Sequence, residues 1–381
     1  MNLFPFRRPD QKPYVLYDYQ VFDMQRFGGI SRYFCEIIER IGIPYKIGVR
    51  YSVNYYLTNG KIRTNIIPLP RFICKRYHSA FNRKNFNWVY DMLRERGNYV
   101  FHPTYYDPYF LDYIGKHPYV VTVHDMIHEL FSELFSAEEN ISAQKKRVIL
   151  NANRIIAISE NTKKDIVELL HVNPDKIDVI YHSTSMKPFS GKKKLDLPEK
   201  YLLYVGDRCC YKNFERFAKV FAKLQKEDAD LFLICTGRSF KADEKKLFDE
   251  LGIADKVRCI KASDKELSEL YGRTSLFVYP SLYEGFGIPI LEAYACHCPI
   301  ALSNTSCFPE IAGEAGCYFD PYSEDSMYEA IKGILYDEEK KKELVRLGDE
   351  RLKLYSWDKA AKATEDVYRK ILMRSFVNNQ E

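Results

Sequence analysis

Two glutamates in the segment SLYEGFGIPILEA, residues 281–293, have a spacing that could serve a binding site. Seven residues separate Glu284 from Glu292, and glycines at 285 and 287 flank the aromatic residue that follows the first glutamate. Carboxylates accept hydrogen bonds from hydroxyl groups, and glycines at a helix N-terminus expose backbone N–H groups that favour an anion. The spacing alone leaves two interpretations open: the wall of a site, or an ordinary loop followed by an amphipathic helix on which Glu292 is a polar position.

Two cations lie in a second loop, within the segment YVGDRCCYKNFERF, residues 204–217. Arg208 and Lys212 follow an apolar run that ends at Gly206, and a helix is predicted to begin near Asn213. An arginine grips phosphate oxygens with two hydrogen bonds, whereas a lysine acts as a point charge. The pair would suit a diphosphate, although a solvated basic loop would have the same composition.

Glycines and histidines mark two further candidate positions. Gly28-Gly29 would let a ligand approach the backbone near the start of a helix, although a double glycine is also common in turns. His124 and His128, in VTVHDMIHE, have the i, i+4 spacing of a zinc-binding helix. A zinc hydrolase is disfavoured because Asp125 stands where that motif needs glutamate, and because His124 ends a predicted strand. His124 is then either a residue of a site or a structural histidine.

Strand and helix patterns alternate along the chain and predict where these residues lie. Runs such as YLLYVG, LFLICTG and SLFVYP are apolar nearly throughout, as expected of parallel strands covered on both faces. Amphipathic stretches between the runs predict helices, so the fold class is α/β with parallel sheets. Ligands of such sheets bind at the carboxyl ends of the strands, where both loops described above are expected. The predicted strands of the first half include residues 14–22, 119–125, 154–159 and 177–183.

The polar, lysine-rich segment MKPFSGKKKLDLPEK, residues 186–200, divides this series into two. A chain of 381 residues, 46% of them hydrophobic, exceeds what one core usually holds. We therefore expect an N-terminal domain over about 1–188 and a C-terminal domain over about 198–355. The amphipathic run at 356–376 predicts one more helix.

Composition argues against several classes of protein. No run of about 18 apolar residues is present, so we expect no transmembrane helix, and the first residues lack the apolar core of a secretory signal. The ten cysteines do not have the spacing of a disulfide framework or a zinc knuckle, which favours free thiols in a reducing compartment. Cys296-His297-Cys298 is interpreted as packing. No Walker loop or G-x-G-x-x-G follows a strand, which disfavours nucleotide hydrolysis and dinucleotide redox chemistry.

The segment RFICKRYHSAFNRKNFNW, residues 71–88, combines basic and aromatic residues and contains no acidic residue. Such a segment could rest on an anionic membrane surface, or it could be a solvated helix with a few packed aromatic rings. No recognisable nucleic-acid module surrounds it, so nucleic acid is not an expected partner.

Together these motifs resemble the retaining glycosyltransferases of family 4, which have the GT-B fold. SLYEGFGIPILEA is similar to the family's E-x7-E signature, and YVGDRCCYKNF is similar to its donor-diphosphate loop. GGISRYF, FHPTYY and VTVHDMIHE lie where the family places acceptor-side elements, and SNTSCFPEIAGEAGCYFDP matches its usual continuation. The resemblance spans nearly the whole chain, with the motifs in the family's order. It departs from the pattern at Asp207, which places a negative charge beside the diphosphate loop.

This resemblance implies two Rossmann-like domains that face each other across a cleft, with the C-terminal helix crossing back to the N-terminal domain. Arg208 and Lys212 would neutralise the diphosphate of a nucleotide-sugar, so no metal and no other cofactor would be needed. Glu284 would bind the hydroxyl groups of the donor sugar, and Glu292 would bind those of the ribose. His124 would lie near the donor sugar. The other donor-binding positions would be Gly29, Ala262, Ser263, Phe286, Gly287 and Ile288.

The resemblance further implies a hexosyltransferase that retains anomeric configuration and whose leaving phosphate takes the acceptor proton. The mannosyltransferase-like loop makes GDP-mannose the first expected donor, with a UDP-sugar as the alternative. The expected acceptor is a glycan or lipid-linked oligosaccharide of surface polysaccharide synthesis, on the cytoplasmic side. If the protein contacts the membrane peripherally, residues 71–88 would form that contact; the solvated-helix interpretation of this segment stays open. A GT-B-fold nucleotide-sugar epimerase and a binding-only subunit are the rival interpretations. The intact Glu284, Glu292, Arg208 and Lys212 argue against the binding-only subunit.

Overall fold

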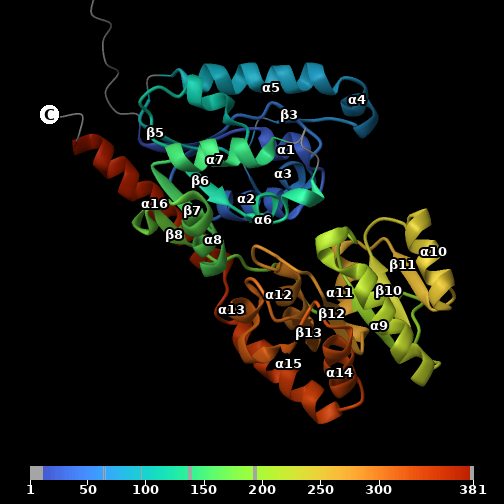
Figure 1. The fold of residues 1–381 in the computed structure, drawn as a ribbon. Helices are drawn as coiled ribbons and strands as arrows, with labels where there is room; N and C mark the ends of the chain where they lie inside the picture. Colours follow the sequence, from blue (N-terminus) through green and yellow to red (C-terminus); the bar gives the residue numbers. More distant parts are fainter. Residues whose placement is uncertain are drawn as a thin grey trace, which may run out of the picture.

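The protein has two α/β domains, each built around parallel strands, in the computed structural model shown in Figure 1. The C-terminal domain lies beneath the N-terminal domain in this view, and the long helix α16 runs along the side of the N-terminal domain. The α/β fold with two Rossmann-like domains, predicted from the sequence, is confirmed. The structure describes residues 12–377, apart from 63, 65, 96, 136–139 and 192–194.

The N-terminal domain contains two three-stranded parallel sheets, ordered β2-β1-β5 and β6-β7-β8. A parallel bridge between Phe101 and Tyr119 joins them along β5 and β6, so the strands form one nearly continuous layer. A short pair, β3 and β4, lies apart from it. The strands are β1 (Tyr14–Tyr17), β2 (Tyr45–Ile47), β3 (Tyr51–Ser52), β4 (Ile67–Pro68), β5 (Tyr99–His102), β6 (Val120–Val123), β7 (Arg154–Ala157) and β8 (Ile177–Val179). The helices are α1 (Gln20–Met24), α2 (Gly29–Ile38), α3 (Tyr55–Asn59), α4 (Arg71–Arg76), α5 (His78–Leu93), α6 (Ile127–Leu130), α7 (Ile141–Asn151) and α8 (Glu160–Leu170).

The C-terminal domain has a single six-stranded sheet, ordered β11-β10-β9-β12-β13-β14 with every pair parallel. The order along the sheet reverses between β9 and β12, where Leu202 pairs with Leu276. In an open α/β sheet, ligands bind in the crevice at this reversal, outside the carboxyl ends of the strands. The strands are β9 (Tyr201–Tyr204), β10 (Phe232–Thr236), β11 (Val257–Ile260), β12 (Leu276–Tyr279), β13 (Ile300–Ser303) and β14 (Cys317–Phe319). The helices are α9 (Phe214–Glu227), α10 (Ala242–Leu251), α11 (Asp264–Arg273), α12 (Ile288–Ala295), α13 (Phe308–Ala312), α14 (Glu324–Leu335) and α15 (Glu338–Leu352).

Apolar strands and one-sided helices explain why this sheet is stable. Leu202 and Leu203 of β9 point to opposite faces, and both are fully buried because helices cover both sides. On α9, Phe217, Phe221 and Leu224 recur at helical spacing and are fully buried against the sheet. Replacing such a phenylalanine with alanine costs about 3–5 kcal/mol. The helix and the sheet thus hold the loops at the strand ends in place.

The C-terminal helix α16 (Trp357–Val377) packs against α2 and the N-terminal strands, which confirms the predicted crossing. Buried hydrogen bonds fix it there: the Tyr368 hydroxyl lies 3.0 Å from that of Tyr17 and 2.7 Å from Nδ1 of His102. The Glu365 carboxylate also accepts the Gly42 N–H at 2.5 Å. The chain therefore ties both domains together through a segment that follows the C-terminal sheet.

The strand predicted over residues 14–22 is only partly correct. β1 ends at Tyr17, and α1 begins three residues later. The cause is Asp18, whose carboxylate is fully buried and accepts hydrogen bonds from the Thr104 backbone N–H (2.8 Å) and the Gln20 side chain (2.7 Å). These contacts turn the chain away from the sheet. The lysines at 192–194, within the predicted linker, lie outside the described residues.

Candidate active site at the junction of the two domains

The loops that follow β9 and β12 meet at the reversal of the C-terminal sheet. The Lys212 ammonium lies 2.5 Å from the Glu284 carboxylate, and both side chains are largely but not wholly buried. The two residues are 72 positions apart in sequence. The structure therefore brings one predicted cation and one predicted carboxylate together at the place where this fold binds ligands.

Asn213 fixes the relation between these loops, and the sequence analysis assigned it no role. Its backbone is left-handed (φ 56°), which an asparagine tolerates better than most residues. Its side-chain amide donates to the carbonyls of Pro280 (3.0 Å) and Pro321 (2.8 Å). The signal available in the sequence was an asparagine directly before an amphipathic helix.

Arg208 does not accompany Lys212 into the site, and this differs from the expected pair of cations. Its side chain is 0% exposed, and its Nε donates to the Glu244 carboxylate at 2.7 Å. Its terminal nitrogens donate to the carbonyls of Thr236 (3.0 Å) and Arg238, and the Phe240 ring lies 4.8 Å away. Glu244 on α10 and the end of β10 thus draw the guanidinium into the domain.

Glu292 lies in the second turn of α12 and is 7% exposed. Burial raises the pKa of its carboxyl group, while the nearby Arg32 guanidinium lowers it. The Tyr271 hydroxyl is 3.4 Å from one carboxylate oxygen, and a terminal nitrogen of Arg32 is 3.7 Å from the other. Arg32 belongs to α2, so this carboxylate faces the N-terminal domain rather than a solvated helix surface.

Gly285 lies where the backbones of the two domains approach each other closely. A Cβ atom at this position would lie 1.8 Å from the carbonyl oxygen of His124, nearer than atoms can approach. The Gly285 carbonyl accepts a hydrogen bond from the Ser159 hydroxyl at 2.7 Å. Glycine is therefore required here for contact between the domains, which the sequence analysis had not anticipated.

The residues that follow Gly285 form a packed turn into α12. Gly287 has φ 82°, a left-handed conformation that favours glycine, and Ile288 begins the helix. The Phe286 side chain is 2% exposed and packs on the rings of His182 (5.1 Å) and Tyr355 (5.9 Å). A donor could therefore meet the backbone of this turn but not the Phe286 ring.

His124 and a second histidine, His182, lie side by side at the same junction, with ring centres 5.8 Å apart. Nε2 of His124 and Nδ1 of His182 are buried without a hydrogen-bond partner. Burial lowers the pKa of His124 to about 4 and holds that of His182 well below its usual range, so both imidazoles are neutral at pH 7. Neutral imidazoles with a free nitrogen suit hydrogen bonds to uncharged hydroxyl groups. Sequence reasoning missed His182, whose only signal was its place after the run IDVIY.

The other predicted donor-binding residues lie at the start of α2 and α11. Space is open around Gly29, the first residue of α2, because an added Cβ would meet no atom within 4 Å. Ala262 is half-buried, and Ser263 caps α11, with its backbone N–H 2.8 Å from the Glu266 carboxylate. The Ser263 hydroxyl also donates to the Glu266 carboxylate at 2.7 Å, so both the N–H and the side chain of Ser263 are already bonded within the helix cap.

Comparison with known proteins identifies the chain. Residues 27–185 match the model of Glycosyltransferase Family 4, and residues 186–351 match that of Glycosyl transferases group 1. The chain is a family 4 glycosyltransferase. The O-antigen chain mannosyltransferase RfbU of Salmonella typhimurium is 30% identical over 215 residues, which cover 56% of this chain and 60% of that protein. The O-antigen chain mannosyltransferase B of Escherichia coli is 28% identical over 294 residues, covering 73% of this chain and 76% of that protein.

Solved structures show that the glycosyltransferase has the GT-B fold. Sucrose-phosphate synthase from Thermosynechococcus elongatus superposes with a TM-score of 0.71 at 18% identity, covering 96% of this chain and 100% of that one. WaaG, a glycosyltransferase involved in lipopolysaccharide biosynthesis, gives a TM-score of 0.67 at 15% identity, covering 93% of this chain and 99% of that one.

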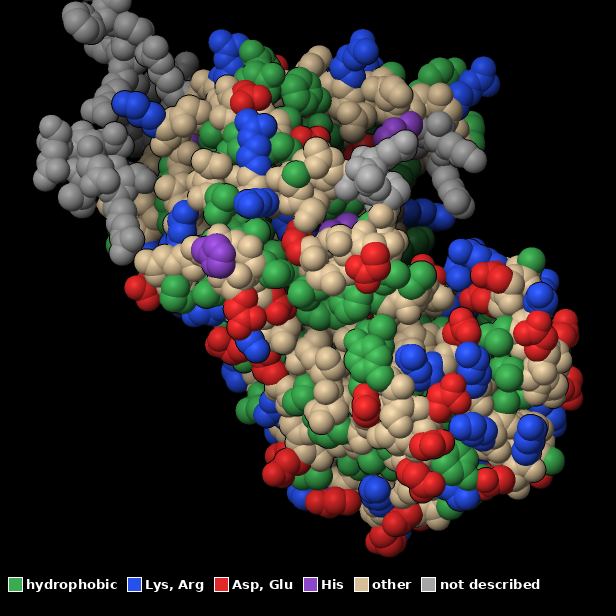
Figure 2. Space-filling model, in the orientation of Figure 1, with side chains coloured by type: hydrophobic (Ala, Val, Ile, Leu, Met, Phe, Trp, Pro, Cys, Tyr) green, Lys and Arg blue, Asp and Glu red, His purple; other side chains and the backbone are tan. Residues whose placement is uncertain are grey.

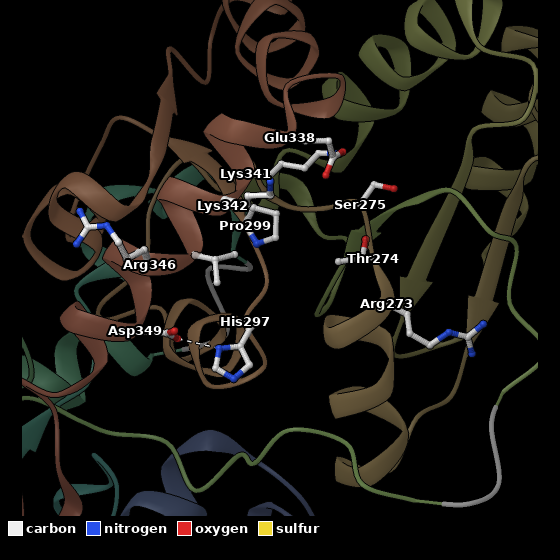
Figure 3. Close-up of a pocket in the computed structure, with 11 residues that line it drawn as sticks. Arg273, Thr274, Ser275, His297, Pro299, Glu338, Lys341, Lys342, Arg346 and Asp349 are labelled. Carbon is white, nitrogen blue, oxygen red and sulfur yellow. Dashed lines mark hydrogen bonds and ion pairs between the residues drawn. The ribbon is translucent and has the colours of Figure 1, made fainter.

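A cavity of about 520 Å³ in the glycosyltransferase lies away from these motifs. Ser275 and Pro299, which line it, directly precede β12 and β13, so it lies at the amino ends of the strands, opposite the carboxyl ends. Figure 3 shows His297 pointing at Asp349, 2.9 Å away, and the Lys341 ammonium is 2.6 Å from Glu338. The other lining cations, Arg273, Lys342 and Arg346, are each paired with a neighbouring carboxylate. Because the cavity lies at the wrong ends of the strands and its cations are paired, we place the site at the domain junction and not here.

The candidate metal ligands of the glycosyltransferase do not form a cluster in the part of the chain that the structure describes. Within the described residues, no group of three or more His, Cys, Asp or Glu side chains could hold a metal ion. The His128 ring packs against Phe135, 4.1 Å away. Cys296 and Cys298 are buried while His297 is bonded to Asp349, as the packing interpretation requires. In the part of the chain that the structure describes, no helix is both long and apolar enough to cross a bilayer.

Proposed function

We propose that the protein is a metal-independent, retaining hexosyltransferase, and that its first donor is GDP-mannose. The observation that carries the proposal is the contact between Lys212 and Glu284 at the reversal of the C-terminal sheet. It pairs a cation for a leaving diphosphate with a carboxylate for sugar hydroxyl groups. The two mannosyltransferases of O-antigen chains named above support the choice of mannose and of a surface glycan as acceptor.

The chemistry requires charge stabilisation more than it requires a protein base. Cleavage of the sugar–phosphate bond places negative charge on the diphosphate and positive charge on the sugar ring. Lys212 and the backbone N–H groups at the start of α12 would stabilise the diphosphate, and fixed charges of this kind usually supply the largest catalytic contribution. The leaving phosphate then takes the proton of the acceptor hydroxyl as that oxygen bonds to the same face of the sugar.

Each remaining residue of the site has a proposed role in this reaction. When the donor binds, the phosphate replaces Glu284 as the partner of Lys212. Glu284 then accepts hydrogen bonds from the sugar hydroxyl groups, while Glu292 accepts them from the ribose. His124, neutral at pH 7, uses its free Nε2 for a hydroxyl group of the donor sugar. Arg208 acts by holding the loop that carries Lys212, because its guanidinium is enclosed by Glu244 and the end of β10.

The face formed by α4 and α5 supports a peripheral contact with an anionic membrane. Phe72 is 75% exposed, and Tyr77 and Trp88 are also exposed. Basic side chains project beside hydrophobic ones along this upper edge in Figure 2. We expect the protein to sediment with vesicles of phosphatidylglycerol but not with vesicles of phosphatidylcholine. Equal sedimentation with both would contradict an electrostatic contact.

The test of the activity uses the purified protein with a panel of GDP- and UDP-sugars and mannose-terminated glycosides. We expect nucleoside diphosphate release that depends on both GDP-mannose and acceptor, an α-linked product by NMR, and no loss of rate in EDTA. A UDP-sugar as the better donor would replace GDP-mannose within the same mechanism. Conversion of a donor to its epimer without acceptor would identify an isomerase instead, and donor binding without turnover would identify a binding subunit.

A further inference from the structure

The charges of the C-terminal domain leave the proposed donor short of cations. A nucleoside diphosphate carries at least two negative charges, and its leaving group gains more as the bond breaks. Lys212 is paired with Glu284, and Arg208 is enclosed. Arg238, next to Arg208, is held by Glu244 (2.7 Å) and Asp207 (3.0 Å). Of these three cations, Lys212 is the one that the donor can reach by replacing a single carboxylate.

The N-terminal domain presents a further cation from the opposite side. Arg32 lies one turn into α2, three residues after Gly29, and its side chain is 15% exposed. Its terminal nitrogen is 3.7 Å from Glu292 and 3.8 Å from Asp264, both in the C-terminal domain. Its Nε also lies 3.9 Å from Glu36 of α2. These distances exceed hydrogen-bond length, so charge holds the guanidinium among three carboxylates without fixing its geometry. The Tyr56 ring, 5.9 Å from the guanidinium, lies against its other side.

The position of Arg32 next to Glu292 agrees with the order in which the ribose and the diphosphate are bonded in a nucleotide. If Glu292 binds the ribose, the diphosphate is attached to the 5′ carbon of that same ribose. A ribose that takes Glu292 removes the nearest carboxylate from Arg32 and leaves it Asp264 (3.8 Å) and Glu36 (3.9 Å), both beyond hydrogen-bond length. A diphosphate that brings its oxygens within hydrogen-bond reach would then compete for the guanidinium. Gly29, on the same face of α2, leaves open space beside it. We infer that Arg32 is a donor-binding residue, whose guanidinium exchanges the Glu292 carboxylate for the donor diphosphate as the domains close on the nucleotide.

With this exchange, the Arg32 side chain has a role both in the empty protein and in the complex with the nucleotide. In the empty protein Arg32 compensates the charge of a buried carboxylate, which burial alone would penalise. In the complex its planar fork can bind two phosphate oxygens at once, which the point charge of a lysine cannot do. A surface ion pair with no ligand role would instead contribute little to binding.

The test compares ligands that differ only in phosphate, and it rests on the proposed function. GDP, UDP, guanosine and uridine are titrated into the full chain, into Arg32→Gln and into Arg32→Lys. We expect Arg32→Gln to weaken diphosphate binding by about 10- to 100-fold, as loss of charged hydrogen bonds implies, while nucleosides bind as before or more tightly. Arg32→Lys should recover part of the loss. Arg40→Gln, which removes another partner of Glu36 just beyond the C-terminal end of α2, is the matched control and should leave binding unchanged.

Three results would overturn the inference. Equal weakening of nucleosides and diphosphates would place Arg32 on the ribose or in the fold alone. If Arg32→Gln binds diphosphates as tightly as the unaltered chain and unfolds at the same temperature, Arg32 has no role in the complex. Failure of the unaltered chain to bind either diphosphate would remove the proposed function itself, and the inference with it.

Discussion

The two domains bring different chemistry to their junction. The C-terminal side offers charged groups in loops at strand ends, with Lys212 paired to Glu284 and Glu292 buried behind them. The N-terminal side offers the neutral imidazoles of His124 and His182 and the Arg32 cation. Lys212 and Glu284 are positioned by their own domain, whereas the His182 ring packs on Phe286 of the other domain. The C-terminal side is thus formed by its own sheet, and the N-terminal side is completed only when the domains meet.

The two cations of the loop after β9 differ in role, because Arg208 is enclosed by its own domain whereas Lys212 lies at the junction. Arg208→Ala removes a fully buried partner of Glu244, so we expect the free energy of unfolding to fall toward the lower end of about 3–5 kcal/mol. Arg238 remains beside Glu244 and limits the loss. Urea unfolding measures the change. Arg238→Ala is the control: it removes a partly exposed partner of the same carboxylate and should cost no more than about 1 kcal/mol. Equal losses in the two variants would show that Arg208 is not a buried structural cation.

Lys212→Ala should have the next largest effect, on catalysis rather than stability. Removing one group that stabilises the leaving charge typically lowers kcat by about 100- to 1,000-fold. The partly exposed Lys212 leaves Glu284 with access to solvent, so thermal unfolding should change little. Lys219→Ala, on the exposed face of α9, is the control. Product formation under saturating donor gives kcat, and a loss confined to KM would assign Lys212 to donor binding alone.

Gly285→Ala tests whether the junction must be close for activity. Its Cβ would meet the His124 carbonyl at 1.8 Å, so the domains must separate or the turn must move. Overpacking of this kind costs about 1–3 kcal/mol. We expect loss of transfer with diphosphate binding retained, because the C-terminal sheet is untouched. Gly333→Ala on α14, where an added Cβ meets only the end of Lys340 at 3.7 Å, is the control and should be fully active. Full activity of Gly285→Ala would show that close contact at this point is unnecessary.

The difference between the domains also explains what the sequence could predict. Glu284 and Lys212 lie in short loops after apolar strands, and Glu292 lies in the helix that follows one of these loops, so local patterns and the family motifs predicted their positions. The inward turn of Arg208 depends on Glu244, 36 residues away and on another helix, and no local pattern contains that pairing. His182 becomes part of the junction only through Phe286, 104 positions later.

Partners that are distant in the sequence also limited the prediction of the fold. The order of alternating strands and helices predicted parallel sheets, and the family resemblance predicted the crossing of the last helix. Strand ends were less predictable, because β1 is ended by Asp18 and Thr104, which are brought together only when β1 and β5 pair. A carboxylate in an apolar run is compatible with both strand and turn until its partner is known.

The smallest expected effect is the pH dependence of folding stability that the neutral imidazoles cause. Burial lowers the pKa of His102 to about 3 and that of His124 to about 4, and holds that of His182 well below its usual range. In the unfolded chain these groups titrate near pH 6.5, so below that value the unfolded state binds more protons than the folded state. Stability from the neutral histidines is therefore complete above about pH 6.5 and is lost as the pH falls toward 4, by at most about 1.4 kcal/mol per pH unit for each group.

His182→Phe isolates one of these groups, because a phenyl ring keeps the packing against Tyr33 and Phe286 but does not titrate. We expect urea unfolding between pH 7 and 5 to show a shallower loss of stability in this variant than in the unaltered chain. Carboxylates near the junction, such as Asp125 and Glu292, titrate in both proteins and cancel in the difference. His297→Asn, which removes an exposed imidazole on the far side of the C-terminal domain, should leave the slope unchanged. An identical slope in His182→Phe would mean that His182 is not held neutral by the contact between the domains, and the N-terminal side would then be formed without its partner.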